Sequence, residues 1–340
     1  MRRPRNLTYA AQRRRRRRLV VILSIFSTAA VVLIGGLTIS RMSQAIRTST
    51  PAASPTASNG FELVSMSTVL DGISRARTIT LTAYSLEPTA TVVHDLEVAA
   101  DRGARVSVAL SRGFGIYVRE NEETATELGG HGIRVHVLES ATQATHMKAV
   151  MLDGNLYLSD RNWAREPGEE IVLLDRIPGD RTLIERAVLG ETGNNDHLWT
   201  RKADALAAEA DMLSQSQSRR VQVESESFSG SSPIFEQLKN LAAMGDDVDL
   251  IVAESEYNRR PSERATLGSL AASGVKVRLL NSDEKFAVAG SAVWIGSANA
   301  TGGAPGQIDF GLVLRDESIA QELSGQFDRE WQQARNVSPD

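Results

Sequence analysis

At residues 146–153 the chain reads His146-Met-Lys148-Ala-Val-Met-Leu-Asp153, and this stretch decides which fold class the sequence favours. The run after Lys148 is short and apolar and ends at the turn pair Asp153-Gly154, which predicts a β-strand. Side chains two apart on a strand leave the same face, so His146 and Lys148 are expected to point together. An imidazole can attack phosphorus and an ammonium can hold phosphate oxygens, so the pair suits chemistry on a phosphodiester.

The spacing of this segment, continued to Asn162, resembles the HKD motif of the phospholipase D superfamily. The superfamily usually continues with Gly-Ser-x-Asn, and here Ser159-Asp160-Arg161-Asn162 keeps only the asparagine. An acidic pair, Glu169 and Glu170, then precedes another apolar run. The resemblance implies that His146 is the nucleophile, that Glu169 or Glu170 supports it, and that the catalytic residues are His146, Lys148, Asp153, Asn162, Glu169 and Glu170.

A degenerate copy of the motif lies 137 residues later. There the chain reads Asp283-Glu-Lys285, then Gly290, then Gly296-Ser-Ala-Asn299, so the lysine and Gly-Ser-x-Asn remain while the histidine and the aspartate are lost. Asp309 stands where the supporting acid of this copy is expected. The resemblance implies that both copies meet in one cleft and that the second half binds phosphate through Asp283, Lys285, Ser297, Asn299 and Asp309.

Segments with strand and helix patterns alternate from Phe61 onward, which is typical of an α/β sandwich. The order repeats after Pro233, except that the second copy is expected to lack one strand–helix unit. With the resemblance, this predicts a duplicated α/β fold of phospholipase D type whose halves are related by a pseudo-twofold axis, behind one transmembrane helix. The predicted segments are a cytoplasmic basic segment (1–18), an anchor (19–40), a flexible linker (41–60), half 1 (61–213), an inter-half linker (214–232) and half 2 (233–336).

The run from Leu19 to Ser40 has 22 residues without a charge, which is long enough for a membrane-spanning helix. Nine arginines and no acidic residue precede it, so the N-terminus is expected in the cytoplasm and the folded domain outside it. A cleaved secretory signal is the alternative, because basic, apolar and small-residue regions occur in that order. The apolar stretch is long for a signal core, so a single-pass anchor is favoured.

The charge distribution and the residue types limit the partners and cofactors. Residues 41–340 carry a net charge of −13, because nine of the 38 basic residues lie before residue 19 while all 42 acidic residues lie after residue 40. Nucleic acid is therefore an unlikely partner, since its binding depends on lysine and arginine. The chain has no cysteine, and its five histidines form no close metal-binding pair, so neither a metal nor another cofactor is expected. The internal duplication predicts a monomer.

Two functions remain open at this stage. The first is a membrane-anchored phosphodiesterase that acts through a covalent phosphohistidine, with phospholipids as the favoured substrates. A missing general acid typically lowers the rate by about 10² to 10⁴, so such an enzyme would be slow or selective for good leaving groups. The second is a catalytically silent module that binds a phosphate-containing ligand or a protein partner.

Overall fold

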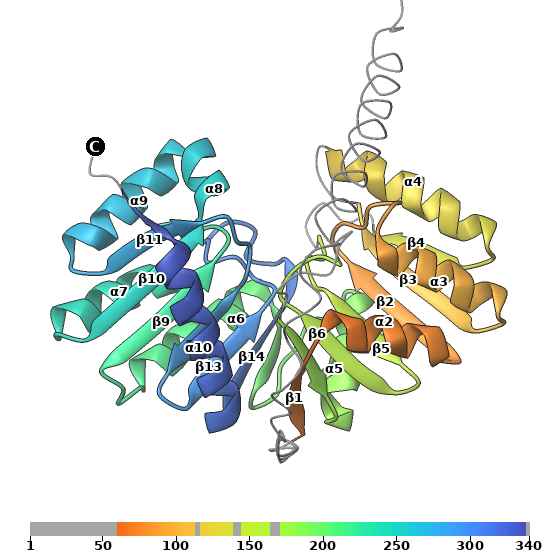
Figure 1. Cartoon of the computed structure of the whole chain (residues 1–340), viewed down its shortest axis with the longest axis horizontal. Coiled ribbons are helices and arrows are strands. Elements are labelled where there is room, and N and C mark those ends of the chain that lie inside the picture. The colour runs from red at the N-terminus through yellow and green to blue at the C-terminus, as the bar shows by residue number, and fades with distance from the viewer. Residues whose placement is uncertain (1–59, 113–115, 139–143, 164–170, 338–340) are drawn as a thin grey trace, which may run out of the picture. The chain divides into compact units, whose positions relative to one another are not determined.

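A computed structural model describes residues 60–112, 116–138, 144–163 and 171–337 (Figure 1). The basic segment, the apolar run and most of the linker predicted for residues 1–60 lie outside these ranges. None of the helices within the described ranges combines the length and the apolar character that a bilayer crossing needs.

The first half of the domain is built on a seven-stranded sheet in the order β1-β7-β6-β5-β2-β3-β4. Strands β2, β3 and β4 are parallel, and the other neighbours are antiparallel. The elements are β1 (Phe61–Val64), α2 (Met66–Arg75), β2 (Thr78–Ala83), α3 (Thr91–Asp101), β3 (Arg105–Ser111), α4 (Ile116–Gly130), β4 (Arg134–Leu138), β5 (Ala149–Leu152), β6 (Asn155–Ser159), β7 (Val172–Asp175) and α5 (Pro178–Val188).

The second half is built on an eight-stranded sheet in the order β15-β11-β10-β9-β12-β13-β14-β8. Here β9, β10 and β11 are parallel. The elements are β8 (Leu198–Arg201), α6 (Lys202–Ser214), β9 (Arg220–Ser225), α7 (Pro233–Ala243), β10 (Asp247–Ala253), α8 (Glu254–Arg259), α9 (Pro261–Ala272), β11 (Lys276–Leu280), β12 (Phe286–Ala289), β13 (Ala292–Gly296), β14 (Ile308–Arg315), α10 (Glu317–Gln333) and β15 (Arg335–Asn336).

The two sheets repeat one topology, which confirms the duplicated α/β fold. Strand β8 stands in the second half where β1 stands in the first, and β9 stands where β2 stands. The predicted inter-half linker at 214–232 is therefore wrong, because β9 lies at its centre and pairs with both β10 and β12. The expectation that the second copy lacks a strand–helix unit is also wrong. The strand that was expected to be absent is β9, which is present in the second sheet.

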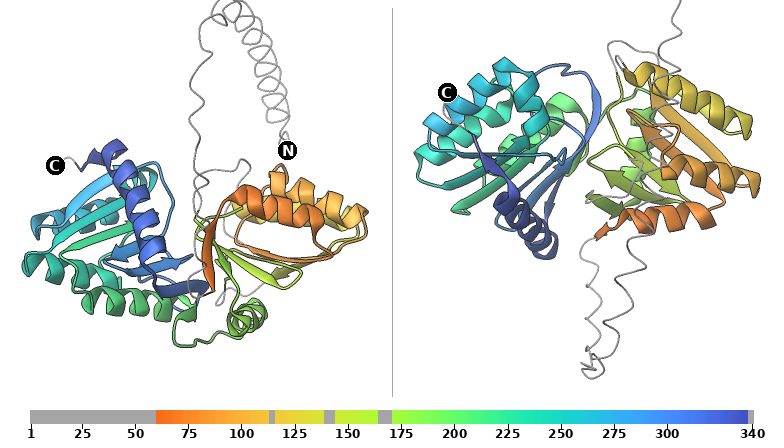
Figure 2. Two further views of the ribbon diagram at one scale, coloured as in Figure 1. Left: turned by 60° about the horizontal axis from the view of Figure 1, so that its bottom comes forward. Right: turned by 45° about the horizontal axis from the view of Figure 1, so that its top comes forward.

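The sheets pack face to face across a shared apolar core. Side chains of β5 to β7 and of β12 to β14 form this layer together with α5 and α10, as in the pair Leu173 and Phe310. Helices α2 and α3 cover the outer face of the first sheet, and α6, α7 and α9 pack on the outer face of the second (Figure 2). Burial of the shared apolar layer is the main force that holds the two halves together, whereas burial of the outer faces stabilises each half by itself.

Equivalent hairpins place both motif lysines at the start of a buried strand. The first hairpin turns at Asp153 and Gly154, whose φ angles of 48° and 106° fit the tight turn that an Asp-Gly pair favours. The second turns at Gly290, whose φ is 68°. Each turn fixes its strand register, so Lys148 precedes β5 just as Lys285 precedes β12.

Candidate active site

His146 is positioned by the other half of the domain. Its backbone N–H donates to the carbonyl of Ile308 at 2.7 Å, and the N–H of Ile308 donates to the carbonyl of Ala144 at 3.1 Å. The residues before β5 therefore pair with the first residue of β14. This pairing places the imidazole next to Asp309, the second residue of β14, although the two are 163 residues apart in sequence.

The contacts of His146 define which ring nitrogen is free to react. Its Nδ1 lies 2.9 Å from the carbonyl of Ser297 and 3.0 Å from Oδ1 of Asp309. Both partners are acceptors, so we assign the ring proton to Nδ1 and the lone pair to Nε2. Burial lowers the pKa of His146, and the nearby Lys148 lowers it further. A neutral imidazole with a free Nε2 is the form that a nucleophile requires.

Asp309 is held in place for this task. Its Oδ1 also accepts a hydrogen bond from the Ser297 hydroxyl at 2.8 Å, and that hydroxyl accepts from the N–H of Phe310 at 2.9 Å. Burial alone would raise the pKa of Asp309, but His146 and Lys148 outweigh burial and lower it. The carboxylate is therefore ionised and orients the ring.

These contacts involve two residues for which other roles were expected. Ser297, predicted to bind phosphate, spends its hydroxyl on Asp309 and on the backbone. The acid that contacts His146 is Asp309 of the second half, whereas the support was expected from Glu169 or Glu170, which lie outside the described residues. The motif spacing could not reveal this exchange between halves, because it depends on how β14 docks on the first motif.

Two buried lysines, one from each half, flank the imidazole. The Lys148 ammonium lies 3.0 Å from Nδ1 and 3.1 Å from Nε2 of His146, and its residue is 1% exposed. Burial together with the charge of Lys285 lowers the pKa of Lys148 to about 7. Lys285, 2% exposed, donates to the carbonyl of Asp283. Two ammonium groups held this close favour an anion between them.

Sequence reasoning missed Glu226, a carboxylate in the same site. Its Oε2 lies 3.3 Å from the Lys285 ammonium. Burial would raise the pKa of Glu226, but Lys285, His146 and Lys148 together lower it to about 2. In the resting site a carboxylate therefore supplies the negative charge that the lysine pair favours.

The pseudo-symmetry explains where Glu226 comes from. Thr82 pairs with Ala149 in the first sheet, and Glu224 pairs with Phe286 in the second, which matches β2 to β9. Glu226 is therefore the counterpart of Tyr84, whose ring packs edge-on against His146 with the ring centroids 4.9 Å apart. Recognition of β9 in the sequence would have been the signal that placed Glu226 at this site.

Of the remaining predicted residues, the two motif asparagines fit the site best. Asn162 and Asn299 are half-buried, and neither side-chain oxygen has a hydrogen-bond partner among the described residues. The Asn299 side chain hydrogen-bonds to Glu226 and helps to keep that carboxylate ionised.

Asp153 and Asp283 do not join the imidazole. Asp153 lies beyond the far end of β5, where its carboxylate accepts from the backbone N–H groups of Arg77 and Thr78. There it holds the hairpin against β2. The Asp283 carboxylate forms an ion pair with Arg161, so the residue that replaces the second histidine is already engaged.

The arrangement at His146 offers groups that suit phosphate chemistry. Among the described residues, one group of three acidic or histidine side chains could hold a metal ion, and it does not include His146. The site instead offers a nucleophilic nitrogen, two cations for phosphate oxygens and a carboxylate that orients the ring.

Comparison with protein families gives one match. The family model for a cardiolipin synthase, PLD-like domain, matches residues 210–331, the part that carries the degenerate motif. A comparison with curated proteins finds no match.

Two solved structures that match 82% of this chain show the same fold. Phosphatidylserine synthase from Haemophilus influenzae matches with a TM-score of 0.63 and 10% identity, over 82% of this chain and 87% of its own. Polyphosphate kinase from Porphyromonas gingivalis matches with a TM-score of 0.59 and 15% identity, over 82% of this chain; the chain spans about half of the kinase, 52%. Nuc from Salmonella typhimurium, a phospholipase D family member, matches 39% of this chain and 90% of its own at 18% identity, with a TM-score of 0.36.

Proposed function

Because the chain belongs to the phospholipase D superfamily, we propose that it transfers the phosphoryl group of a phosphodiester through His146. The family match and the shared fold support phosphoryl transfer as the general function. The observation that carries the proposal for this chain is the state of His146: Nδ1 is bound by Asp309, Nε2 lies beside the Lys148 ammonium, and the charge of Lys285 from the other half also acts on the ring.

The proposed reaction has two steps. Nε2 attacks phosphorus, a P–N bond forms, and the P–O bond to the leaving alcohol breaks while Lys148 and Lys285 hold the non-bridging oxygens. Water then attacks phosphorus, the P–N bond breaks, and His146 is restored as a phosphate monoester leaves. Asp309 stabilises the ring while it carries positive charge in the first step.

The first step also requires a proton for the oxygen of the leaving group. The second histidine is absent, and Asp283, which replaces it, pairs with Arg161. Glu226 is ionised in the resting site, with a pKa of about 2. Neither of these two carboxylates supplies the proton, so in the proposed mechanism water protonates the leaving oxygen, which favours substrates whose leaving groups are stable as anions.

Membrane attachment and a phospholipid substrate remain part of the proposal. They are supported by the uncharged run 19–40, by the nine arginines before it and by the acidic remainder of the chain. Release of the protein from membranes by an alkaline carbonate wash would contradict the anchor.

A silent phosphate-binding module is the second candidate, and Glu226 is the observation that favours it. A carboxylate beside Lys285 occupies the charge position that a phosphate would fill. Such a site binds an anion only when the Glu226 carboxylate moves away from Lys285 or becomes protonated. The two candidates share the lysine pair and differ in whether His146 reacts.

The lysine pair and Glu226 are expected to change anion affinity in opposite directions. Lys285→Met removes one charge-assisted contact and should weaken sulfate binding about tenfold, whereas Glu226→Gln removes the competing charge and should strengthen it about tenfold. Isothermal titration with sulfate measures both variants. Glu236→Gln, an exposed glutamate on α7, is the control and should bind as the wild type does. Equal affinity in all four proteins would show that sulfate binds elsewhere.

Anion affinity is also expected to depend on pH. Lys148 has a pKa of about 7, so its ammonium is mostly present at pH 6 and mostly lost at pH 8. Sulfate keeps a constant charge over this range, and its affinity should fall about tenfold between these values as the lysine loses its proton. Titrations at pH 6, 7 and 8 test this, with Lys148→Met as the variant whose affinity should stay flat. A wild-type affinity that rises with pH would contradict the assignment.

A further inference from the structure

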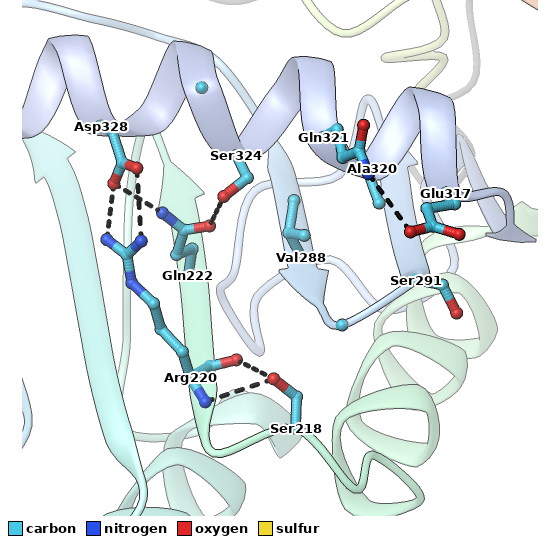
Figure 3. A pocket seen from close by; sticks show the side chains of 12 residues that line it. Ser218, Arg220, Gln222, Val288, Ser291, Glu317, Ala320, Gln321, Ser324 and Asp328 are labelled. Carbon is cyan, nitrogen blue, oxygen red and sulfur yellow. Dashed lines mark hydrogen bonds and ion pairs between the residues drawn. The ribbon is translucent and has the colours of Figure 1, made fainter.

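A row of polar side chains lines the face of β9 that packs on α10. Arg220 forms an ion pair with Asp328, and Gln222 contacts Ser324 and Asp328 of the helix (Figure 3). In a strand, side chains two apart share a face, so the next member of this row is Glu224. The first two members have partners on the helix.

Glu224 instead meets two other glutamates in a buried carboxylate cluster. The cluster consists of Glu224 on β9, Glu284 before β12 and Glu330 on α10, which are 2%, 1% and 5% exposed. One carboxylate oxygen of each lies within 4.8 Å of the other two. Three acids at this depth are unusual, because an isolated buried carboxylate is costly.

The hydrogen bonds around the carboxylate cluster leave several oxygens unused. Gln326 donates its amide to Glu284 at 2.7 Å and to Glu330 at 3.1 Å. Neither oxygen of Glu224 meets hydrogen-bond geometry with a donor among the described residues, although Ser282 and Glu330 lie close enough to influence its pKa, and the second oxygen of Glu330 also has no partner there. The unpartnered side chain of Glu224 thus points at its two neighbours.

The other half of the protein shows that the fold does not require these acids. Glu284 is 137 residues after Met147, and Glu224 is the counterpart of Thr82 through the strand register. Met147 is fully buried in the shared apolar core. The same topology is therefore built with a methionine and a threonine in one half and with two glutamates in the other.

The charge around the carboxylate cluster is unbalanced. Among the described residues, Arg161 is the cation that forms an ion pair with the carboxylate cluster. Its guanidinium nitrogen Nη1 lies 4.0 Å from Oε1 of Glu284, and it also pairs with Asp283. When all three acids are ionised, they and one guanidinium leave two negative charges, which is the charge that a divalent cation would neutralise. The nearby Asp160 adds negative potential, since both its oxygens accept only from backbone N–H groups, those of Ile171 and Lys285.

We propose that the carboxylate cluster of Glu224, Glu284 and Glu330 is a binding site for a divalent cation, calcium. All its ligand atoms are hard carboxylate oxygens, and three carboxylates can supply up to six of the six to eight oxygens that calcium takes. Calcium–oxygen bonds of about 2.3–2.6 Å allow ligand atoms to lie up to about 5 Å apart, which accommodates the 4.8 Å spread. Magnesium needs shorter bonds and usually keeps several waters, for which so buried a site leaves little room.

The site is linked to protons and to the phosphate site. Burial, followed by the charge of Glu224, raises the pKa of Glu284 to about 11, so without a cation the cluster holds protons at neutral pH. Calcium must displace them, and its affinity should increase with pH. Because Glu284 lies next to Lys285, whose N–H binds Asp160, a cation here would also fix the backbone that carries this lysine.

Thermal unfolding of the full-length protein, freed of metal by chelator and then given millimolar calcium, tests the proposal. The midpoint should rise by about 5 °C or more, and calorimetric titration should show one calcium per chain. Glu224→Gln and Glu330→Gln should fold and lose both signals. Glu322→Gln, an exposed change on the same helix, should keep them.

Three results would overturn the proposal. They are no calcium-dependent shift or heat in the wild type, an undiminished response in Glu224→Gln, and an equal shift with magnesium at the same concentration. The test does not depend on the chemistry of His146, because sulfate titration of the same samples reports on that site separately.

Discussion

His146→Ala is expected to lower the turnover of bis(4-nitrophenyl) phosphate by about 10³-fold or more. This substrate is chosen because nitrophenolate leaves without a general acid, so the missing second histidine does not limit the wild type. In the variant no group replaces Nε2: the chain has no cysteine, and His131 and His197 pair with acids away from the lysine pair. The measurement is the steady-state rate of nitrophenol release.

The control for this variant is His94→Ala, which removes an exposed imidazole. It should retain the wild-type rate. His146→Ala should still bind sulfate, because Lys148 and Lys285 remain, and this separates loss of chemistry from loss of the fold. A rate within threefold of the wild type in His146→Ala would rule out the covalent mechanism.

Asp309→Asn is expected to lower kcat about 10²-fold with little change in KM. The carboxylate accepts a hydrogen bond from Nδ1–H and stabilises the charged ring, whereas an amide lacks the charge and can present its NH₂ group to the ring instead. Sulfate binding should survive, because the Asp309 carboxylate bonds to His146 and Ser297, whereas Lys285 pairs with Glu226.

Asp180→Asn provides a matched control for this variant. Asp180 is also a fully buried carboxylate that pairs with a histidine, His197, but it lies on α5. Its neutralisation should cost stability and leave kcat unchanged. Equal losses of kcat in the two variants would show that Asp309 acts through general stability and not through the orientation of His146.

Much of this architecture was predictable from the sequence, and the reason is the internal repeat. The 137-residue offset correctly related the two hairpins and the two lysines, because apolar strands and turn glycines follow the buried core. The offset did not reveal the repeat before residue 233, where β9 lies. In β9, Val221 and Val223 alternate with polar residues whose partners lie on α10, and serines flank the strand, so its composition resembled a linker.

The site was less predictable, because it depends on contacts between the halves. Sequence spacing gives the position of a residue along its strand but not the side chain that meets it from the other sheet. Asp309 reaches His146 only because Ile308 pairs with the residues before β5. Glu226 could not be placed at all until β9 was known. For Asp153 the motif spacing predicted the correct place at the hairpin turn, but it did not show that the carboxylate bonds to the backbone next to β2.

The structure shows how the charged residues of the degenerate motif are paired. With the second histidine replaced, Asp283 pairs with Arg161 and Lys285 pairs with Glu226, so the charges of the altered half are balanced within that half. The first half keeps an imidazole in the protonation state that a nucleophile needs. The asymmetry is consistent with one working nucleophile and no dedicated acid for the leaving group.

The most direct test of the central claim is to trap the intermediate on His146. Wild-type protein mixed rapidly with bis(4-nitrophenyl) phosphate, quenched in alkali and analysed by peptide mass spectrometry should carry an acid-labile phosphoramidate on His146. The burst of nitrophenol should equal about one per active chain. Turnover without a burst or an adduct would contradict the account, and no turnover with sulfate binding intact would identify the protein as the silent binding module.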